Sequence, residues 1–299
     1  MENRRRHTVK DWMTAVRPWS FPASAMPVIV ALGYLFATGA EVDWVNGIWA
    51  LLNIVVFHAA GNTWSDYFDF RKKVDAEDTF GVKTLTSGMF TPGEIFRLSL
   101  SLLAVAVLAG ILLWLRTGMT LLYIGVGGAA CSLLYPYLKY HALGDLVIFI
   151  AYAFLPMAGT SYVATMEIDW TVLYLAVPVG LITVAILHCN NTRDMDTDSR
   201  AGIRTLAMNL GDRVSVWLYC FEVLFPFLWI SGCVIAGVLP VWTLLVWTVF
   251  IPALMNARMA AGYFRKGSES IARLDEATAR LQLLFSLVLT VSYIIVGLF

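Results

Sequence analysis

The chain has 299 residues, of which 59% are hydrophobic and only 14% are charged, and its mean hydropathy is +0.71. A soluble domain carries about 25% charged residues, and a disordered chain cannot keep so many large apolar side chains solvated, so both classes are excluded. The formal charge is zero at pH 7, which gives no indication of binding to nucleic acid.

Nine apolar segments follow one another along the chain, and each is long enough to cross a bilayer. A helical span needs about 20 apolar residues, and the runs are continuous rather than alternating, which excludes a membrane β-barrel. The sequence therefore predicts an all-α polytopic membrane protein, with a single transmembrane domain over residues 1–299. The expected spans cover residues 20–38, 46–64, 95–115, 119–138, 144–165, 170–189, 214–237, 239–260 and 280–299.

The basic residues are distributed unevenly over this arrangement of spans. Of the 21 lysines and arginines, only Arg116 falls in a connection on the side opposite the N-terminus. Because basic loops remain on the cytoplasmic side, we expect a cytoplasmic N-terminus and place Phe299 on the outer face. These features predict a protein of a bacterial inner membrane whose long polar loops face the cytoplasm.

Acidic residues gather at the ends of the second and sixth spans. Each cluster combines a carboxamide with two carboxylates at helical spacing, so that its members share one helix face. The first cluster consists of Asn62, Asp66 and Asp69, and the second of Asn190, Asp194 and Asp198. Oxygen ligands of this kind suit Mg²⁺. The alternative is a pair of solvated acidic loops, but carboxylates close to the hydrocarbon cost about 2.5–3.5 kcal/mol each and require compensation.

The two clusters belong to an internal repeat. Their carboxamides, Asn62 and Asn190, are 128 residues apart, and so are the first carboxylates. A Gly-aliphatic-cation-Thr-Leu sequence follows each cluster, at residues 81–85 and 202–206. The repeat predicts a pseudo-repeated helical bundle around a central cavity, with both polar loops on the same side of the membrane. These Asp-rich loops cover residues 61–94 and 190–213.

Two facing clusters are expected to hold Mg²⁺ ions around a diphosphate, because metal ions and cationic side chains stabilise that group as it leaves. Cations near the clusters are expected to bind its oxygens, together with Asn62 and Asn190. They are Arg17, Arg71, Lys72, Lys83, Lys139, Arg193 and Arg204. Beside apolar helices, the donor would be a lipid whose tail remains in the bilayer. If the lipid is allylic, loss of diphosphate leaves a cation that aromatic faces can stabilise. The candidate aromatic residues are Trp64, Tyr67, Phe68 and Tyr135. Each is equally well explained as an aromatic residue of the membrane interface.

With these motifs the sequence resembles the UbiA superfamily of intramembrane aromatic prenyltransferases. The resemblance covers nearly the whole chain and includes nine helices, the two Asp-rich motifs and a Tyr-x-x-x-Lys element from Tyr135 to Lys139. It implies a polyprenyl diphosphate donor and binding of its oxygens by Lys139. The Mg²⁺ and diphosphate ligands that it implies are Asn62, Asp66, Asp69, Asp194 and Asp198. The catalytic residues expected on this basis are Asp66, Asp194, Lys139 and Tyr135.

The aromatic acceptor is suggested by finer features of the resemblance. The first motif is one residue shorter than the commonest spacing, which leaves either Asp69 or Asp75 to complete the first metal site. The shorter spacing and the sequences at 17–24 and 190–207 are similar to the branch that prenylates 1,4-dihydroxy-2-naphthoate with loss of carbon dioxide in menaquinone synthesis. The Tyr135 element is more typical of the 4-hydroxybenzoate branch. Prenylation of 4-hydroxybenzoate or another aromatic acceptor therefore remains an alternative.

A function of another class, divalent-cation transport, also uses acidic clusters in membranes. It predicts polar residues at the middle of the bilayer, whereas here the carboxylates gather at cytoplasmic helix ends. Two histidines near the clusters, His58 and His188, are expected to be hydrogen-bonded core residues, with contact to substrate as the alternative. Asp145 is expected either to orient a cation such as Lys139 or to interact with a helix N-terminus.

Overall fold

The computed structural model describes residues 7–73 and 83–299, and all regular structure in this part of the chain is helical. Eight helical segments are long and apolar enough to cross a membrane. A ninth crossing results if Val9–Ser20 and Pro22–Ala37, which meet at an angle of 50°, form one bent span. The prediction of an all-α multi-pass membrane protein is therefore confirmed, with eight to nine candidate spans.

The α-helices are α1 (Val9–Val16), α2 (Pro22–Ala37), α3 (Trp44–Arg71), α4 (Pro92–Thr117), α5 (Met119–Lys139), α6 (Gly144–Phe149), α7 (Leu155–Thr165), α8 (Val172–Arg193), α9 (Met195–Arg200), α10 (Leu206–Ile235), α11 (Phe250–Ala261), α12 (Tyr263–Lys266) and α13 (Leu274–Leu298). The shorter turns are the 3₁₀ segments η1 (Pro18–Ser20), η3 (Val241–Val249) and η4 (Gly267–Ile271) and the π-helical segment η2 (Ile150–Phe154).

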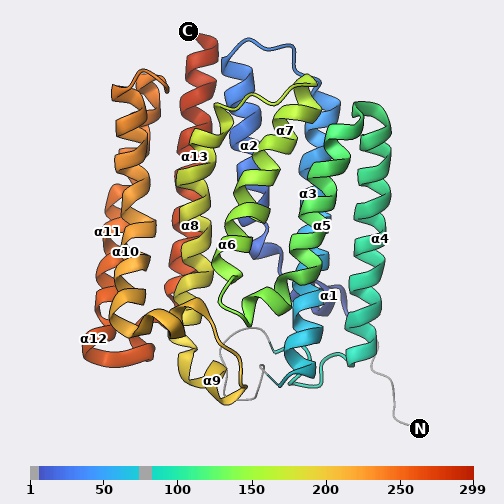
Figure 1. The fold of residues 1–299 in the computed structure, drawn as a ribbon, viewed down its shortest axis with the longest axis vertical. Helices are drawn as coiled ribbons and strands as arrows, with labels where there is room; N and C mark the ends of the chain where they lie inside the picture. The colour runs from blue at the N-terminus through green and yellow to red at the C-terminus, as the bar shows by residue number, and fades with distance from the viewer. Residues whose placement is uncertain (1–6, 74–82) are drawn as a thin grey trace.

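The long helices stand side by side, and the short helices α1, α9 and α12 lie at one end of the bundle (Figure 1). The chain ends at the opposite end, as expected for an odd number of crossings. The basic and acidic loops predicted to be cytoplasmic are thus at the end that carries α1, α9 and α12.

The centre of the bundle is built around α8. Two-thirds of its most apolar window is buried, whereas only 6% of the corresponding window of α5 is buried. Val179 and Ile182 of α8 pack in one apolar cluster with Phe227 of α10 and Phe285 of α13. Since the second acidic cluster directly follows this stretch of α8, it projects from the most firmly packed helix of the protein.

Two irregular backbone segments shape the interior. Arg17 ends α1 in the left-handed conformation, with φ 56° and ψ 62°, and Pro18 begins η1 directly after it. The fifth span changes from α-helix to π-helix at Ile150–Phe154 before it continues as α7. Strained residues and π-helical turns are frequent at functional sites, and both segments contribute residues to the cavity described next.

Candidate active site

A cavity of about 760 Å³ lies inside the bundle and is lined by residues of both repeats. Its volume is in the range of sites that bind small molecules. Ten of the residues predicted from the sequence line it: Arg17, Asn62, Asp66, Asp69, Tyr135, Lys139, Asn190, Arg193, Asp194 and Asp198. The remaining wall is largely apolar and comes mainly from α4, α5 and α7, with residues such as Ile111, Leu121, Ile124 and Val163.

The first acidic cluster is held against the bend between α1 and α2. Asp66 is only 4% exposed and accepts hydrogen bonds from Arg17 Nη2 and, at 3.4 Å, from Thr84 Oγ1. Asn62 donates from Nδ2 to the backbone oxygen of Val16, at 3.0 Å, and to Ser20 Oγ, at 3.1 Å. Asn62 therefore fastens the bend, and the bend in turn positions Arg17 on Asp66.

Asp69 connects the first cluster to α5. Its Oδ1 accepts a 2.5 Å hydrogen bond from Tyr140 Oη, and its Oδ2 lies 3.5 Å from Lys139 Nζ. Ser65 Oγ donates to the same Oδ2 at 3.2 Å. Both carboxylates of the first cluster are thus paired with a cation that itself lines the cavity.

The second cluster repeats this pairing. Arg193 Nε and Nη2 each donate to one oxygen of Asp194 at 2.8 Å, and Arg193 Nη1 also lies 3.5 Å from Asp275 Oδ2. Burial raises the pKa of Asp198 to about 6; Lys139 opposes this increase, and the carboxylates of Asp194 and Asp69 add to it. Residues of both clusters line the same cavity, so the two clusters share one space.

The side chains present fit Mg²⁺ at this site. Asn190 Oδ1 is buried in the cavity wall and has no hydrogen-bond partner among the described residues. Five aspartates and Glu276 line the cavity against the three cations Arg17, Lys139 and Arg193, so negative charge is in excess. Carboxylate and carboxamide oxygens are the ligands that Mg²⁺ takes from proteins, with water and phosphate oxygens completing its shell.

Four predicted diphosphate ligands do not belong to the cavity lining formed by the described residues. Arg71 donates from Nη1 to Tyr67 Oη at 3.2 Å, and Lys72 lies over the Tyr140 ring, 5.2 Å from its centroid. Lys83 and Arg204 are exposed. Asp75, the alternative first-site ligand, and the start of the 81–85 repeat lie outside the described residues.

Three predicted aromatic residues are also turned elsewhere. Trp64 and Tyr67 pack on Phe96, with ring centroids 6.0 and 4.8 Å apart, and Phe68 packs on both of them. None of the three lines the cavity formed by the described residues. Of the aromatic candidates named from the sequence, only Tyr135 does.

The structure adds cavity residues that sequence reasoning did not single out. Tyr152 lies in the π-helical segment and meets His58 edge to face at a centroid distance of 4.9 Å. His58 Nδ1 is hydrogen-bonded to Ser24 Oγ at 2.9 Å, as expected for a core histidine, but it also lines the cavity. Tyr140, which does not line the cavity but donates a hydrogen bond to Asp69, had a weak signal because it directly follows Lys139. Ser24 ends the 17–24 sequence that carries part of the resemblance, whereas Tyr152 had no signal.

Comparison with known proteins decides the family. The model of the UbiA prenyltransferase family matches residues 24–297. The chain belongs to the UbiA prenyltransferase family. Membership of this family makes the chain a multi-pass integral membrane protein and favours prenyl transfer over divalent-cation transport.

Several vertebrate proteins are similar to this member of the UbiA family. The chain is 34% identical over 223 residues to UbiA prenyltransferase domain-containing protein 1 of Xenopus tropicalis, a match that covers 73% of this chain but only 64% of the frog protein. It is 31% identical over 292 residues to the protein of the same name from Mus musculus, which covers 94% and 83% of the two chains.

Solved structures support the same fold. A UbiA homolog from Aeropyrum pernix K1 superposes with a TM-score of 0.70 at 17% identity, covering 92% of this chain and 97% of that chain. A UbiA homolog from Archaeoglobus fulgidus, bound to GPP and Mg²⁺, superposes with a TM-score of 0.56 at 12% identity, covering 94% and 99%. At these identities the likeness concerns the fold alone.

Proposed function

We propose that this UbiA-family enzyme transfers a polyprenyl group from polyprenyl diphosphate to 1,4-dihydroxy-2-naphthoate. Diphosphate and carbon dioxide leave, and the product is a demethylmenaquinol. The observation that carries the proposal is the cavity in which two Asn/Asp clusters, Arg17, Lys139 and Arg193 surround one space beside an apolar wall. The Archaeoglobus homolog was solved with GPP and Mg²⁺, a donor of this chemical class with the same metal ion.

The polar end of the cavity is suited to the diphosphate. Mg²⁺ held by Asn62, Asp66, Asp69, Asp194 and Asp198 would supply charge neutralisation to the leaving group. Arg17, Lys139 and Arg193 present hydrogen-bond donors in the same space, and their present carboxylate partners keep them oriented toward it. Electrostatic stabilisation of developing negative charge by preorganised donors is a large contribution to catalysis.

The apolar part of the cavity is suited to the prenyl chain and to an aromatic ring. Departure of diphosphate from an allylic carbon leaves a positive charge, which the π faces of Tyr135 and Tyr152 would stabilise. The ring carbon that bears the carboxylate forms the new carbon–carbon bond, and the carboxylate then leaves as carbon dioxide with the ring electrons restored. An electron-rich dihydroxynaphthoate requires little activation, so no Ser-His-Asp arrangement is needed.

The proposed location is a bacterial inner membrane, with the cavity opening toward the cytoplasm. The basic loops lie at the end of the bundle that carries α1, α9 and α12, which is the end that the positive-inside rule assigns to the cytoplasm (Figure 1). A water-soluble aromatic acid and a membrane-embedded prenyl diphosphate would reach such a site from the cytoplasm and the bilayer respectively.

Parallel assays with two acceptors test the proposal. Membranes containing the protein are supplied with one polyprenyl diphosphate and Mg²⁺, and with either 1,4-dihydroxy-2-naphthoate or 4-hydroxybenzoate. We expect a prenylated naphthalene product and one carbon dioxide per product from the carboxyl-labelled naphthoate. If only 4-hydroxybenzoate is prenylated, the proposed acceptor is wrong but the proposed reaction, prenyl transfer to an aromatic ring, stands. If neither acceptor is prenylated, the whole proposal is contradicted.

A further inference from the structure

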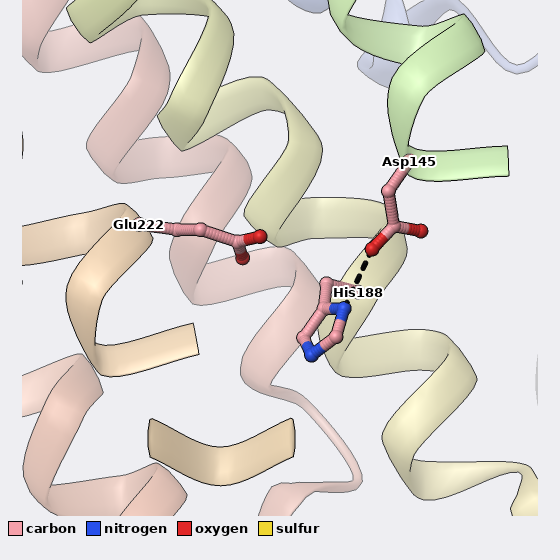
Figure 2. A group of neighbouring side chains, drawn as sticks. All are labelled: Asp145, His188 and Glu222. Carbon is pink, nitrogen blue, oxygen red and sulfur yellow. Dashed lines mark hydrogen bonds and ion pairs between the residues drawn. The ribbon is translucent and has the colours of Figure 1, made fainter. Parts of the chain in front are cut away.

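A second cluster of ionisable side chains lies inside the bundle and does not line the cavity. Asp145 of α6, His188 of α8 and Glu222 of α10 are brought together from three different spans (Figure 2). Their exposed fractions are 6%, 0% and 3%. One ligand atom from each lies within 4.8 Å of the others.

The ring of His188 is oriented from both sides. Its Nδ1 lies 2.7 Å from Asp145 Oδ2, and its Nε2 lies 3.1 Å from the backbone oxygen of Ser215. A histidine that binds a metal through one ring nitrogen typically donates the other N–H to a backbone carbonyl or carboxylate, which fixes its tautomer and orientation. Nε2 also lies 3.0 Å from Ser215 Oγ, and Nδ1 faces the carboxylate of Asp145.

Glu222 is a buried carboxylate, and its Oε2 has no hydrogen-bond partner among the described residues. In the same part of the chain no lysine or arginine forms an ion pair with Glu222 or Asp145. Its carboxylate is directed toward His188 from the side opposite Asp145 (Figure 2). An uncompensated carboxylate in a bundle interior is costly, so this side chain indicates a missing positive charge.

The net charge of Asp145, His188 and Glu222 favours a divalent cation as the source of that positive charge. Two carboxylates carry two negative charges, and protonation of His188 offsets only one of them. A divalent cation bound by both carboxylates and a neutral imidazole makes the cluster neutral. Ion pairs in a low-dielectric interior are favourable only when charge and geometry are both satisfied.

The spacing also fits a metal. Zinc bonds of about 2.0–2.2 Å to nitrogen and oxygen ligands place the ligand atoms of a tetrahedral site about 3.3 Å apart. His188 Nδ1 and Asp145 Oδ2 are 2.7 Å apart, so this pair would open by about 0.6 Å around the ion, and the three ligand atoms already lie within 4.8 Å of one another. A mixed imidazole and carboxylate set favours zinc and neighbouring transition metals, whereas Mg²⁺ prefers oxygen ligands alone.

We propose that Asp145, His188 and Glu222 bind one divalent transition-metal ion of the zinc class, separate from the Mg²⁺ site in the cavity. The ion would join α6, α8 and α10 just before the second acidic cluster. The same network continues toward that cluster, because Asn191 Nδ2 lies 3.5 Å from Asp145 Oδ1 and Thr192 Oγ1 lies 2.5 Å from Ser215 Oγ. The site is therefore structural and positions the end of α8.

Cobalt binding tests this proposal, since Co²⁺ in a tetrahedral nitrogen and oxygen site absorbs visible light. The full chain in nanodiscs is treated with chelator and then titrated with Co²⁺, without substrate. We expect one Co²⁺ per chain, displaced by Zn²⁺ but not by millimolar Mg²⁺. The Asp66→Asn/Asp194→Asn double variant should keep the full signal, because it changes only the cavity. Glu222→Gln and His188→Gln should each weaken Co²⁺ binding at least about tenfold.

Two results would overturn the site. One is loss of all Co²⁺ binding in the Asp66→Asn/Asp194→Asn double variant, which would assign the bound ion to the cavity. This result overturns the proposed site even if Glu222→Gln fails to fold. The other is Glu222→Gln binding Co²⁺ like the unchanged protein, which would leave the cluster as an imidazolium held by Asp145. Neither result depends on prenyl transfer, so the metal site and the proposed reaction fail independently.

Discussion

Lys139 Nζ lies 3.5 Å from Asp69 Oδ2, which joins the Tyr-x-x-x-Lys element of α5 to the first acidic cluster on α3. Tyr140 strengthens the connection through its 2.5 Å hydrogen bond to the other oxygen of Asp69. Besides the metal binding implied by the family resemblance, Asp69 thus orients Lys139, which lines the cavity. Asp145, which the sequence offered as a partner for Lys139, pairs with His188 instead.

Removal of the Tyr140 hydroxyl tests this connection. We expect Tyr140→Phe to lower kcat/KM for the prenyl diphosphate about tenfold, since a hydrogen bond to a charged group contributes about 1.5–3 kcal/mol. The effect should appear mainly in KM for the donor, because Lys139 is left less well oriented. Tyr137→Phe is the matched control, as Tyr137 is 60% exposed. If Tyr140→Phe and Tyr137→Phe have equal kinetics, the hydrogen bond from Tyr140 to Asp69 does not help to position Lys139.

The central carboxylate of each cluster is expected to be essential. Asp66→Asn and Asp194→Asn should each reduce turnover by about three orders of magnitude or more, because they remove both a metal ligand and the partner of an arginine. Asp196→Asn is the control, since Asp196 is exposed and lies outside the cavity lining. Thermal melting in detergent should be similar for all three; near-normal turnover of the first two would remove the metal-site proposal.

Chelation tests the metal requirement directly. A brief treatment of the membranes with EDTA should abolish prenyl transfer, and added Mg²⁺ should restore it. Ca²⁺ should restore much less, because it prefers more ligands at longer distances than Mg²⁺ does. Product formation is followed by mass spectrometry. Turnover that persists in excess chelator is the result that would contradict a metal-dependent reaction.

Tyr152 is expected to contact the aromatic acceptor or the allylic carbon. Its ring lies at the cavity wall against His58, and no hydrogen bond to its hydroxyl is seen among the described residues. Tyr152→Ala should therefore raise KM for the naphthoate about tenfold, whereas Tyr152→Phe, which keeps the ring, should differ from the unchanged enzyme by less than about twofold. Steady-state kinetics at saturating donor distinguish the two. Equal effects of both substitutions would assign the contribution to the hydroxyl.

The opposite end of the bundle offers a test of stability against pH. Burial raises the pKa of Asp169, but hydrogen bonds from Tyr34 Oη, at 2.6 Å, and Thr171 N, at 2.8 Å, outweigh burial and leave the pKa below its usual 3.8. A carboxylate with a lowered pKa in the folded state contributes stability above its ordinary pKa and loses it as pH falls through the lowered value.

We therefore expect Asp169→Ala to lower the melting temperature by a few degrees at pH 7. The difference from the unchanged protein should remain constant down to about pH 5 and decrease below 3.8. Glu167→Ala, at an exposed position in the same loop, serves as the control and should melt like the unchanged protein. A difference between Asp169→Ala and the unchanged protein that is independent of pH would mean that the carboxylate charge plays no part.

The sequence alone determined the membrane class, the positions of the spans and the two acidic clusters. Hydropathy and helical spacing are local properties of the chain. A run of apolar residues predicts a span, and an Asn-x-x-x-Asp spacing puts both side chains on one helix face, whichever helices pack around them. The internal repeat also placed Asn62 and Asn190 at equivalent positions, and both line the cavity.

The tertiary structure decided which of the neighbouring side chains face that cavity. Arg17 and Lys139 line it whereas Arg71 and Lys72 do not, although Arg71 and Lys72 follow the first cluster directly in the sequence. A helix presents neighbouring residues in different directions, and the direction that faces the cavity depends on packing against helices distant in the chain. Packing between helices distant in the chain also brings together Asp145, His188 and Glu222, which are separated by up to 77 residues. No local sequence pattern predicts this buried cluster.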